Sequence, residues 1–407
     1  MKMNAVYEKI ESMRDDMVNA LCSIIRIPAI SPKSGGEGEA KKAELITRML
    51  NDIGFDSIER YDAPDNSAPT GVRPNIVARM KGEGDKNLWI VVHMDVVPPG
   101  DLRLWKTNPF EPVVKDGKII GRGAEDNGQE LIASLFALKA LKSLGYRPKM
   151  NVNLAIVADE ETGSNYGIKY LIDKGLFNKE DLILVPDGGN SEGTLIEIAE
   201  KSIVWIKFTT KGKQCHASMP DLGINAFKVS IILANRLIEE LPKKFNATDE
   251  LFDRPYSTFE PTKKEANVPN VNTIPGEDIF YMDCRILPLY NVNDVLEFIQ
   301  SVARDVEKET GARISVEVVQ GGQAPPPTPK DAEIVGMLSK AIKKVYGVDA
   351  KPGGIGGGTC AAIFRQRGYN AVVWSKIDDT AHSPNEYAII DNLVGDAKVY
   401  ATLFLES

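Results

Sequence analysis

Apolar runs that alternate with amphipathic helical stretches constrain the fold of this chain more than any other feature. Four runs are apolar on both faces, as strands of a helix-covered sheet are: NIVARM at 75–80, LWIVVHM at 88–94, NVNLAIVA at 151–158 and DLILVPD at 181–187. Residues 5–28, 41–51 and 129–143 instead repeat apolar side chains at helical spacing. The alternation predicts an α/β domain with a mostly parallel sheet covered by helices.

The pattern changes near residue 202, where half-exposed strands replace buried ones. The predicted elements are, in order, a strand at 202–212, a helix at 225–241, strands at 271–277 and 278–288 around a Pro-Gly turn, a helix at 292–310 and a strand at 313–322. The order β-α-β-β-α-β is that of a ferredoxin-like unit, which closes its own small core. We therefore predict an inserted domain at 202–320 within a catalytic domain formed by 1–201 and 321–407, with a stiff Pro-rich linker at 320–331.

Composition excludes several classes of function. With 407 residues, 43% hydrophobic and 26% charged, the chain has the composition of a soluble globular protein of two or three domains. A net charge of −8 without a Lys/Arg stripe argues against a nucleic-acid partner. No apolar run has the form of a secretory signal or the length of a membrane span, so we expect a cytoplasmic protein without a membrane partner. The four cysteines are too far apart to indicate a disulfide framework or zinc knuckle.

His93 ends one of the apolar strands, in the segment VVHMDVV. Residues two apart on a strand face the same way, so Asp95 can accept a hydrogen bond from the imidazole nitrogen that does not bind metal. A histidine with a carboxylate behind it is also a common structural hydrogen bond, and this pair alone leaves both interpretations open.

Three further carboxylate segments fall at strand ends. Asp126 in GAEDNG precedes the helix at 129, Glu160 and Glu161 in DEETG directly follow a strand, and Asp187 ends the strand in LVPDGG. Helix capping explains Asp126 taken alone, and a solvated charged loop explains the two glutamates. Open α/β sheets place their sites at the carboxyl edge, so we expect all of these segments to form one site.

The ligand types indicate the cofactor. His382, in AHSPNE near the C-terminus, supplies a second imidazole. Two histidines and three or more carboxylates suit zinc, cobalt or manganese. One zinc needs only about three protein ligands, so this set favours two divalent metal ions that share a carboxylate. One of Glu160 and Glu161 then binds metal, and the other is left as the general base for water.

Together these segments resemble the di-zinc amidohydrolase and exopeptidase family that includes acetylornithine deacetylase, succinyl-diaminopimelate desuccinylase, aminoacylase and glutamate carboxypeptidase. The resemblance extends from about residue 20 to the end and rests on HMD, GAEDNG, DEETG, PDGG and AHSPNE in combination. It implies two zinc ions, with cobalt or manganese as alternatives. It also implies a role for each residue: His93 and Asp187 hold one metal, His382 and Glu161 hold the other, Asp126 bridges them, Glu160 is the general base, and Asp95 lies behind the first histidine.

The same resemblance implies that the inserted domain is a lid through which the protein forms a homodimer. KGKQCHASMP matches the lid motif, so His216 is expected to stabilise the oxyanion. Asn272 in NVNTIPG and Arg285 in DCRILP match positions that bind a substrate carboxylate. Without the resemblance, Asn272 reads equally well as a turn residue and Arg285 as a surface charge.

Gly357, Gly358 and Thr359 in GGIGGGTCAA resemble the substrate loop of the family. The chain departs from the family pattern at two places. Cys215 lies beside His216 where another small residue is usual, and Cys360-Ala361 replace the Ser-Asp of the better-known desuccinylases. The second departure weakens any transfer of desuccinylase specificity to this chain.

These residues predict a hydrolase that cleaves the amide bond of N-acyl amino acids through a water bridged by two metal ions, with Glu160 as general base. The expected substrate is a small molecule or short peptide with a free carboxylate. A dipeptidase or carboxypeptidase with the same di-metal site is the alternative, because the catalytic residues do not distinguish acyl from aminoacyl groups. A non-catalytic binding protein of this fold is a remote alternative, which predicts a missing ligand or base, and neither is missing here.

Overall fold

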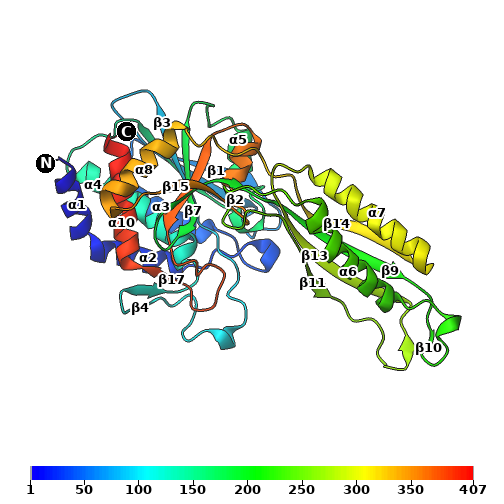
Figure 1. The fold of residues 1–407 in the computed structure, drawn as a ribbon. Coiled ribbons are helices and arrows are strands. Elements are labelled where there is room, and N and C mark those ends of the chain that lie inside the picture. The colour runs from blue at the N-terminus through cyan, green and yellow to red at the C-terminus, as the bar shows by residue number, and fades with distance from the viewer. Residues whose placement is uncertain (1, 407) are drawn as a thin grey trace. The chain divides into compact units, whose positions relative to one another are not determined.

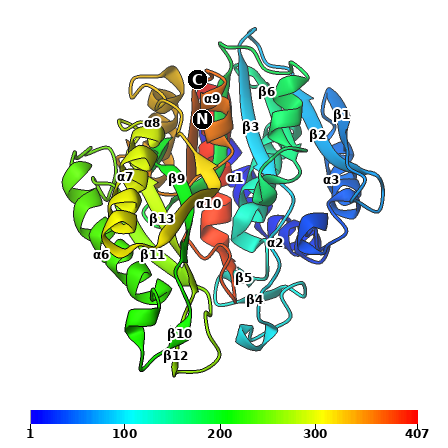
Figure 2. The same ribbon diagram turned by 90° about the vertical axis from the view of Figure 1, so that its right-hand side faces the viewer.

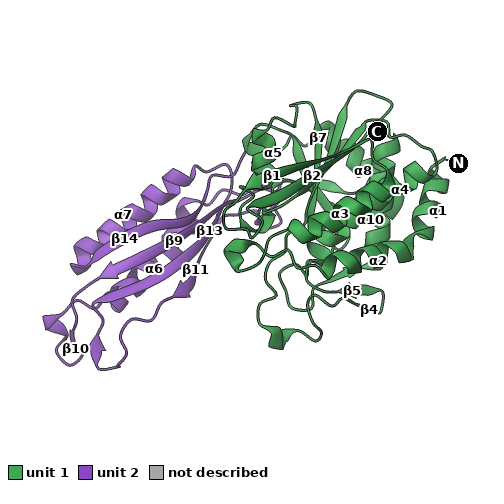
Figure 3. Ribbon diagram, turned by 180° about the vertical axis from the view of Figure 1, so that it is seen from behind, with its two compact units in different colours: residues 1–198, 327–352, 359–407 green, residues 199–326, 353–358 purple. Residues whose placement is uncertain are grey.

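The computed structural model describes residues 2–406 and divides into two compact units (Figure 3). The first unit contains the residues up to 198, 327–352 and those from 359 onward, and the second contains 199–326 and 353–358. The predicted boundaries, 202 and 320, lie near those of the second unit. The short segment 353–358 differs from the prediction, which assigned it to the catalytic domain.

An eight-stranded sheet forms the centre of the first unit (Figure 1). Its order is β1-β2-β6-β3-β7-β16-β8-β15, with bounds β1 (Ser57–Pro64), β2 (Val72–Met80), β3 (Asn87–His93), β6 (Asn151–Val157), β7 (Leu182–Asn190), β8 (Leu195–Glu200), β15 (Lys351–Ile355) and β16 (Ala371–Lys376). The central pairs β6-β3, β3-β7 and β7-β16 are parallel, whereas β1 and β2 join at one edge by antiparallel pairing. This arrangement confirms the predicted α/β class with a mostly parallel sheet.

Helices cover both faces of this sheet (Figure 2). They are α1 (Lys2–Ser12), α2 (Arg14–Ile25), α3 (Ala40–Ile53), α4 (Glu130–Ser143), α5 (Ile168–Asp173), α8 (Glu333–Tyr346), α9 (Ala361–Gln366) and α10 (Ile390–Glu406). Helices α5 and α9 share a core with alternate residues of the central strands, such as Trp89, Val91 and Val185. The predicted single helix at 5–28 is two helices, because the chain leaves helical geometry at Met13, where ψ is 9°.

The second unit is an antiparallel sheet of order β11-β13-β9-β14 with two helices. Its elements are β9 (Ser202–Lys211), α6 (Ala226–Lys244), β11 (Thr258–Lys264), β13 (Glu277–Ile286), α7 (Val292–Thr310) and β14 (Arg313–Gly322). Alternate residues of β9 and β13 pack against α6 and α7, and the rings of Phe208 and Phe280 stack 4.6 Å apart. The order is the predicted β-α-β-β-α-β.

One predicted strand of this unit was wrong. Within 271–276 only β12 (Thr273–Ile274) is a strand, and Glu277 already begins β13. Strand β12 pairs with β10 (Cys215–His216) in a separate two-stranded ribbon. The strand of the main sheet is β11, which contains Pro261 and a register shift between Pro261 and Lys263. Proline is tolerated at a sheet edge but suggests a loop in the sequence, which explains the error.

A small sheet of the first unit joins two parts of the chain that are distant in sequence. Its order is β17-β5-β4, with β4 (Val113–Lys115), β5 (Lys118–Ile120) and β17 (Tyr387–Ile389). The pairing brings the segment before Asp126 beside the segment after His382. Among the described residues, no helix is long and apolar enough to cross a membrane.

Candidate metal centre

His93 lies at the last position of β3 and is 2% exposed. Its Nε2 atom is 2.9 Å from Asp126 Oδ1 and 3.3 Å from Asp187 Oδ1. Its Nδ1 donates a hydrogen bond to the backbone carbonyl of Asp95 at 3.0 Å, and the Asp95 carboxylate is farther away, at 3.5 Å. The predicted acceptor was the Asp95 carboxylate, whereas the structure gives this hydrogen bond to the backbone oxygen of the same residue. This bond leaves Nε2 as the nitrogen that can bind a metal.

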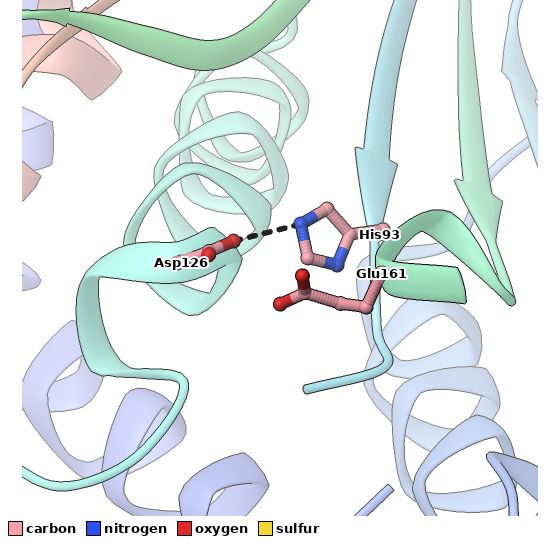
Figure 4. Close-up of side chains that lie close together, drawn as sticks. All are labelled: His93, Asp126 and Glu161. Carbon is pink, nitrogen blue, oxygen red and sulfur yellow. Dashed lines mark hydrogen bonds and ion pairs between the residues drawn. The ribbon is translucent and has the colours of Figure 1, made fainter. Parts of the chain in front are cut away.

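Asp126 lies between the two imidazoles. Its Oδ1 faces His93, and its Oδ2 lies 3.0 Å from Nε2 of His382. The same His382 nitrogen is 3.0 Å from Glu161 Oε2. Figure 4 shows how His93, Asp126 and Glu161 converge from the end of β3, the loop before α4 and the turn after β6. A carboxylate with one oxygen toward each of two histidines has the geometry of a bridging ligand.

Two sets of ligand atoms lie within 4.8 Å of one another: those of His93, Asp126 and Glu161, and those of His93, Glu160 and Asp187. The structure therefore brings all the sequence-predicted metal ligands of the first unit to one place. It also places Glu160 close enough to bind a metal ion. Proximity alone therefore does not show whether Glu160 is a metal ligand or the general base.

The carboxylates of this centre carry an excess of negative charge. Burial raises the pKa of Glu161 to about 7, and the neighbouring Asp126 charge adds to the effect. Burial likewise raises the pKa of Glu160, with the charge of Asp187 as the next cause. Both carboxyl groups are therefore harder to ionise than in water, because burial and neighbouring negative charge oppose the charged form.

The imidazoles respond in the opposite sense. Hydrogen bonds to Asp126 and Glu161 raise the pKa of His382 to about 10. Burial lowers the pKa of His93, but the charge of Asp187 and the hydrogen bond to Asp126 outweigh burial and raise it. The site thus favours additional positive charge, which a divalent cation would supply.

The environment of one carboxylate oxygen shows that these residues suit a metal ion. Oε1 of Glu161 is buried and has no hydrogen-bond partner among the described residues. An unpartnered buried acceptor is costly, at about 1–3 kcal/mol. A cation among these oxygens and the two Nε2 atoms would satisfy it, and the donor set of nitrogen and oxygen atoms suits zinc, cobalt or manganese.

The turn that carries Glu160 and Glu161 is held by Asp95. The carboxylate oxygens of Asp95 accept the two backbone N–H groups of these glutamates, each at 3.1 Å. The turn begins at Asp159, whose φ of +62° lies in the left-handed region. Asp95 therefore connects the end of β3 to the turn after β6.

A buried ion pair behind this turn was not predicted. Arg73 donates two hydrogen bonds to Glu39, and both side chains are fully buried. Glu39 also accepts the backbone N–H of Asp159 at 3.3 Å, and Asp159 Oδ1 lies 3.5 Å from Arg73. The two partners come from separate elements and share no local motif, so the sequence contains no signal for the pair.

Asn127 was also missed. Its Oδ1 accepts the backbone N–H of His93 at 3.2 Å, and its Nδ2 donates to the Pro186 carbonyl at 2.6 Å and to Asp187 Oδ1 at 3.1 Å. It thus joins the end of β3 to the middle of β7, which continues past Asp187 to Asn190 and so does not end where the sequence predicted. Its position directly after Asp126 in GAEDNG is the signal that could have indicated this role.

The lid residues predicted from the sequence lie in the second unit. His216 and Thr273 pair in the β10-β12 ribbon, next to Asn272, whose carbonyl accepts the backbone N–H of Ala217. The backbone N–H of Ser218 donates to His216 Nδ1 at 3.2 Å. In the neutral imidazole the proton therefore sits on the exposed Nε2, which can donate to an oxyanion. Cys215 donates to a carbonyl of its own turn.

Arg285 is already engaged within the second unit. It donates to both oxygens of Asp283, at 2.6 and 2.9 Å, and to the carbonyl of Gly356 at 2.8 Å. Arg285, Lys201 and Arg254 line a cavity of about 330 Å³ together with Gly356. Burial, followed by the charges of Arg254 and Arg285, lowers the pKa of Lys201. Asp253 also lines the cavity, so three cationic side chains stand against one carboxylate, and this net positive charge suits an anionic group.

The glycine-rich loop is divided between the units. Gly357 and Gly358 belong to the second unit, and Thr359 belongs to the first. The hydroxyl of Thr359 accepts the backbone N–H of Ala361 at 3.2 Å, at the start of α9. This contact is a local turn between residues two apart, just before α9, and it assigns no substrate role to the loop.

Comparison with known proteins gives a consistent result. Residues 89–406 match the family described as Peptidase family M20/M25/M40. A protein of Methanocaldococcus jannaschii named an uncharacterized metallohydrolase is 44% identical over 402 residues, which cover 95% of this chain and 98% of the relative. A succinyl-diaminopimelate desuccinylase of Polynucleobacter necessarius is 26% identical over 385 residues, 93% of this chain and 95% of the relative.

Solved structures share the fold. Human carnosine dipeptidase 1 has a TM-score of 0.78 at 20% identity, covering 100% of this chain and 98% of the other. The YXEP protein of Bacillus subtilis, described as a dinuclear metal binding peptidase from the M20 family, has a TM-score of 0.64 at 16% identity and covers 97% and 98%. The family match and the 44% identical relative confirm the resemblance found in the sequence. The chain belongs to Peptidase family M20/M25/M40 and is a metallohydrolase.

Proposed function

We propose that this metallohydrolase cleaves the amide bond of an N-acyl amino acid or a short peptide that bears a free carboxylate. The observation that carries the proposal is Asp126, whose two oxygens face the Nε2 atoms of His93 and His382. Two divalent metal ions, zinc or alternatively cobalt or manganese, would be held by these residues with Asp187 and Glu161. Such ions polarise a carbonyl and make water acidic enough to attack it at neutral pH.

The protein groups contribute the proton transfers and the positioning. Glu160, held by the bond from its N–H to Asp95, accepts the proton of the attacking water and returns it to the leaving amine. His216, with its proton on Nε2, donates to the oxyanion. The electropositive cavity at Arg285, Lys201 and Arg254 supports a substrate with a carboxylate. A carboxylate bound there would share the Arg285 guanidinium with Asp283.

A dipeptidase or carboxypeptidase activity is the second candidate. The relatives named desuccinylases favour an acyl group, whereas the fold is shared with a dipeptidase. Comparing hydrolysis of N-acetyl and N-succinyl amino acids with that of dipeptides separates the two.

The predicted homodimer is also part of the proposal. Helix α6 exposes Phe227, Ile231 and Ile238 at helical spacing, each more than 40% exposed. A second copy of the chain covering this stripe would remove apolar surface from water. Dimerisation, like a cytoplasmic location, stays a prediction.

The test is metal content and amide hydrolysis measured on the same samples of wild type and Asp126→Ala. We expect about two metal ions per chain in the wild type, lost together with activity in the variant. Wild-type protein that binds no metal, and that added zinc, cobalt or manganese does not activate, contradicts the proposal.

A further inference from the structure

Glu125, which precedes the proposed bridging residue Asp126, belongs to neither set of candidate ligands and hydrogen-bonds to another segment. Its Oε2 accepts the backbone N–H of Asp378 at 2.9 Å, and its Oε1 accepts both the backbone N–H and the hydroxyl of Thr380. These residues lie in the segment between β16 and β17 that carries His382. Glu125 is 3% exposed, so these bonds form out of contact with water.

Glu386 makes the reverse connection. It follows His382 in the chain and is fully buried. Its oxygens accept the backbone N–H groups of Gly123, Glu125 and Asp126, each at 3.0 Å, and its charge is paired with Arg122 at 2.6 Å. Each glutamate therefore holds the segment that carries the other.

The His382 segment depends on such contacts. Between β16 and β17 it contains no helix or strand, and the His382 side chain is 57% exposed with a φ of +59°. Packing therefore does little to fix the imidazole. The bonds from Asp378 and Thr380 to Glu125 place its segment relative to Asp126, whose Oδ2 the imidazole must face.

We propose that Glu125 and Glu386 are positioning residues that lock the Asp126 and His382 segments together, and that Glu125 sets the affinity for the metal held by His382 and Glu161. The inference rests on the proposed metal centre. Glu386 forms an ion pair with Arg122, so removing Glu386 would also leave the buried Arg122 charge without this partner. Among residues 2–406, no cationic side chain forms an ion pair with Glu125, so Glu125 is the cleaner site for a test.

The test is a titration of metal-free protein with Co²⁺. Calorimetry and the visible absorption of the bound ion measure the affinity of each site. We expect the wild type to bind two ions. Glu125→Ala should keep the affinity of one site within about threefold and weaken the other roughly 10- to 100-fold, the range for lost outer contacts of a metal ligand. Glu125→Gln retains one acceptor oxygen and the side-chain volume, so its affinity at the weakened site should lie between those of the wild type and Glu125→Ala. It replaces the alanine variant in the test if that variant does not fold.

Asp181→Asn is the matched control. Asp181 is also a buried carboxylate with three donors: the backbone N–H of Asn178, the indole of Trp89 and the amide of Asn87. It lies level with Asn87, at the opposite end of β3 from His93 and roughly 20 Å away at the rise of a strand. The control should lose thermal stability and keep both Co²⁺ affinities.

Three results are distinguishable. Weakening of one site only in the Glu125 variants supports the inference. The inference is overturned if those variants keep wild-type affinities at both sites and lose only stability, as Asp181→Asn does. That result leaves the proposed function intact. A wild type that binds no Co²⁺ overturns the metal centre itself, and the inference with it.

Discussion

Asp95 accepts the backbone N–H of Glu160 at 3.1 Å, so the residue behind the first imidazole also fixes the turn that bears the predicted general base. Asp95→Ala should lower kcat roughly 10- to 100-fold, because the turn that carries Glu160 loses the acceptor of its backbone N–H groups, whereas the backbone bond from His93 to residue 95 remains. The measurement is kcat at saturating metal. Asp95→Asn, which keeps one acceptor oxygen, should lose less. Equal activity of Asp95→Ala and wild type would remove Asp95 from the mechanism.

Glu160→Gln separates a general base from a metal ligand at a position where the structure permits both. We expect turnover to fall by about 10²–10⁴-fold, the usual contribution of a general base, while elemental analysis still finds the wild-type metal content. The amide keeps the size of the side chain and cannot take up the proton. A loss of metal in parallel with activity would instead make Glu160 a ligand.

Removal of the metal should destabilise the first unit. Without a cation, the carboxylate of Asp126 repels those of Glu161 and Asp187, and Glu161 Oε1 has no hydrogen-bond partner within residues 2–406. Ligand binding at about 100 times Kd stabilises a protein by about 2.7 kcal/mol. We expect a chelator to lower Tm and added zinc to restore it. In Asp126→Ala the chelator should have little effect, and an unchanged wild-type Tm would contradict a metal bound at this site.

His216→Ala should lower kcat about 10²–10³-fold, the usual effect of losing an oxyanion donor. Metal content should stay at the wild-type level, because His216 lies in the second unit and not among the ligands of the first. The paired measurement is kcat with elemental analysis. A change confined to KM would assign His216 to substrate binding instead.

We expect the ionisation of Asp396 to make the free energy of unfolding depend on pH. It is fully buried on α10 and accepts hydrogen bonds from the Tyr346 hydroxyl at 2.7 Å and the Lys376 backbone N–H at 3.1 Å. Burial raises the pKa of Asp396 from 3.8 to about 6. Because this folded-state pKa exceeds the unfolded one, the contribution of the neutral acid is full below about pH 4 and is lost as the pH rises through about 6.

The measurement is Tm of Asp396→Asn minus Tm of wild type at a series of pH values. The asparagine cannot ionise, so the difference should shift in favour of the variant between about pH 4 and pH 7. A difference that stays constant over this range would mean that Asp396 does not titrate there.

The sequence predicted the α/β class because strand and helix periodicities are local properties. Residues 88–94 and 151–158 are apolar on both faces, and the strands they form, β3 and β6, pair in the parallel centre of the sheet. The strand at 258–264 was missed for the same reason, since Pro261 and its charged neighbours give a local signal for a loop. Only the pairing of β11 with β13 makes that segment a strand.

The sequence by itself also determined which residue types reach the metal centre, because each of His93, Asp126 and Glu161 stands in a short motif at the end of a predicted element. Only the tertiary structure decided that the oxygens of Asp126 face different imidazoles. It alone decided that Glu125 and Glu386, 261 positions apart, hold each other's segments. Motifs are read from neighbours along the chain, whereas these hydrogen bonds depend on the path of the chain through the whole unit, which spacing in the sequence does not specify.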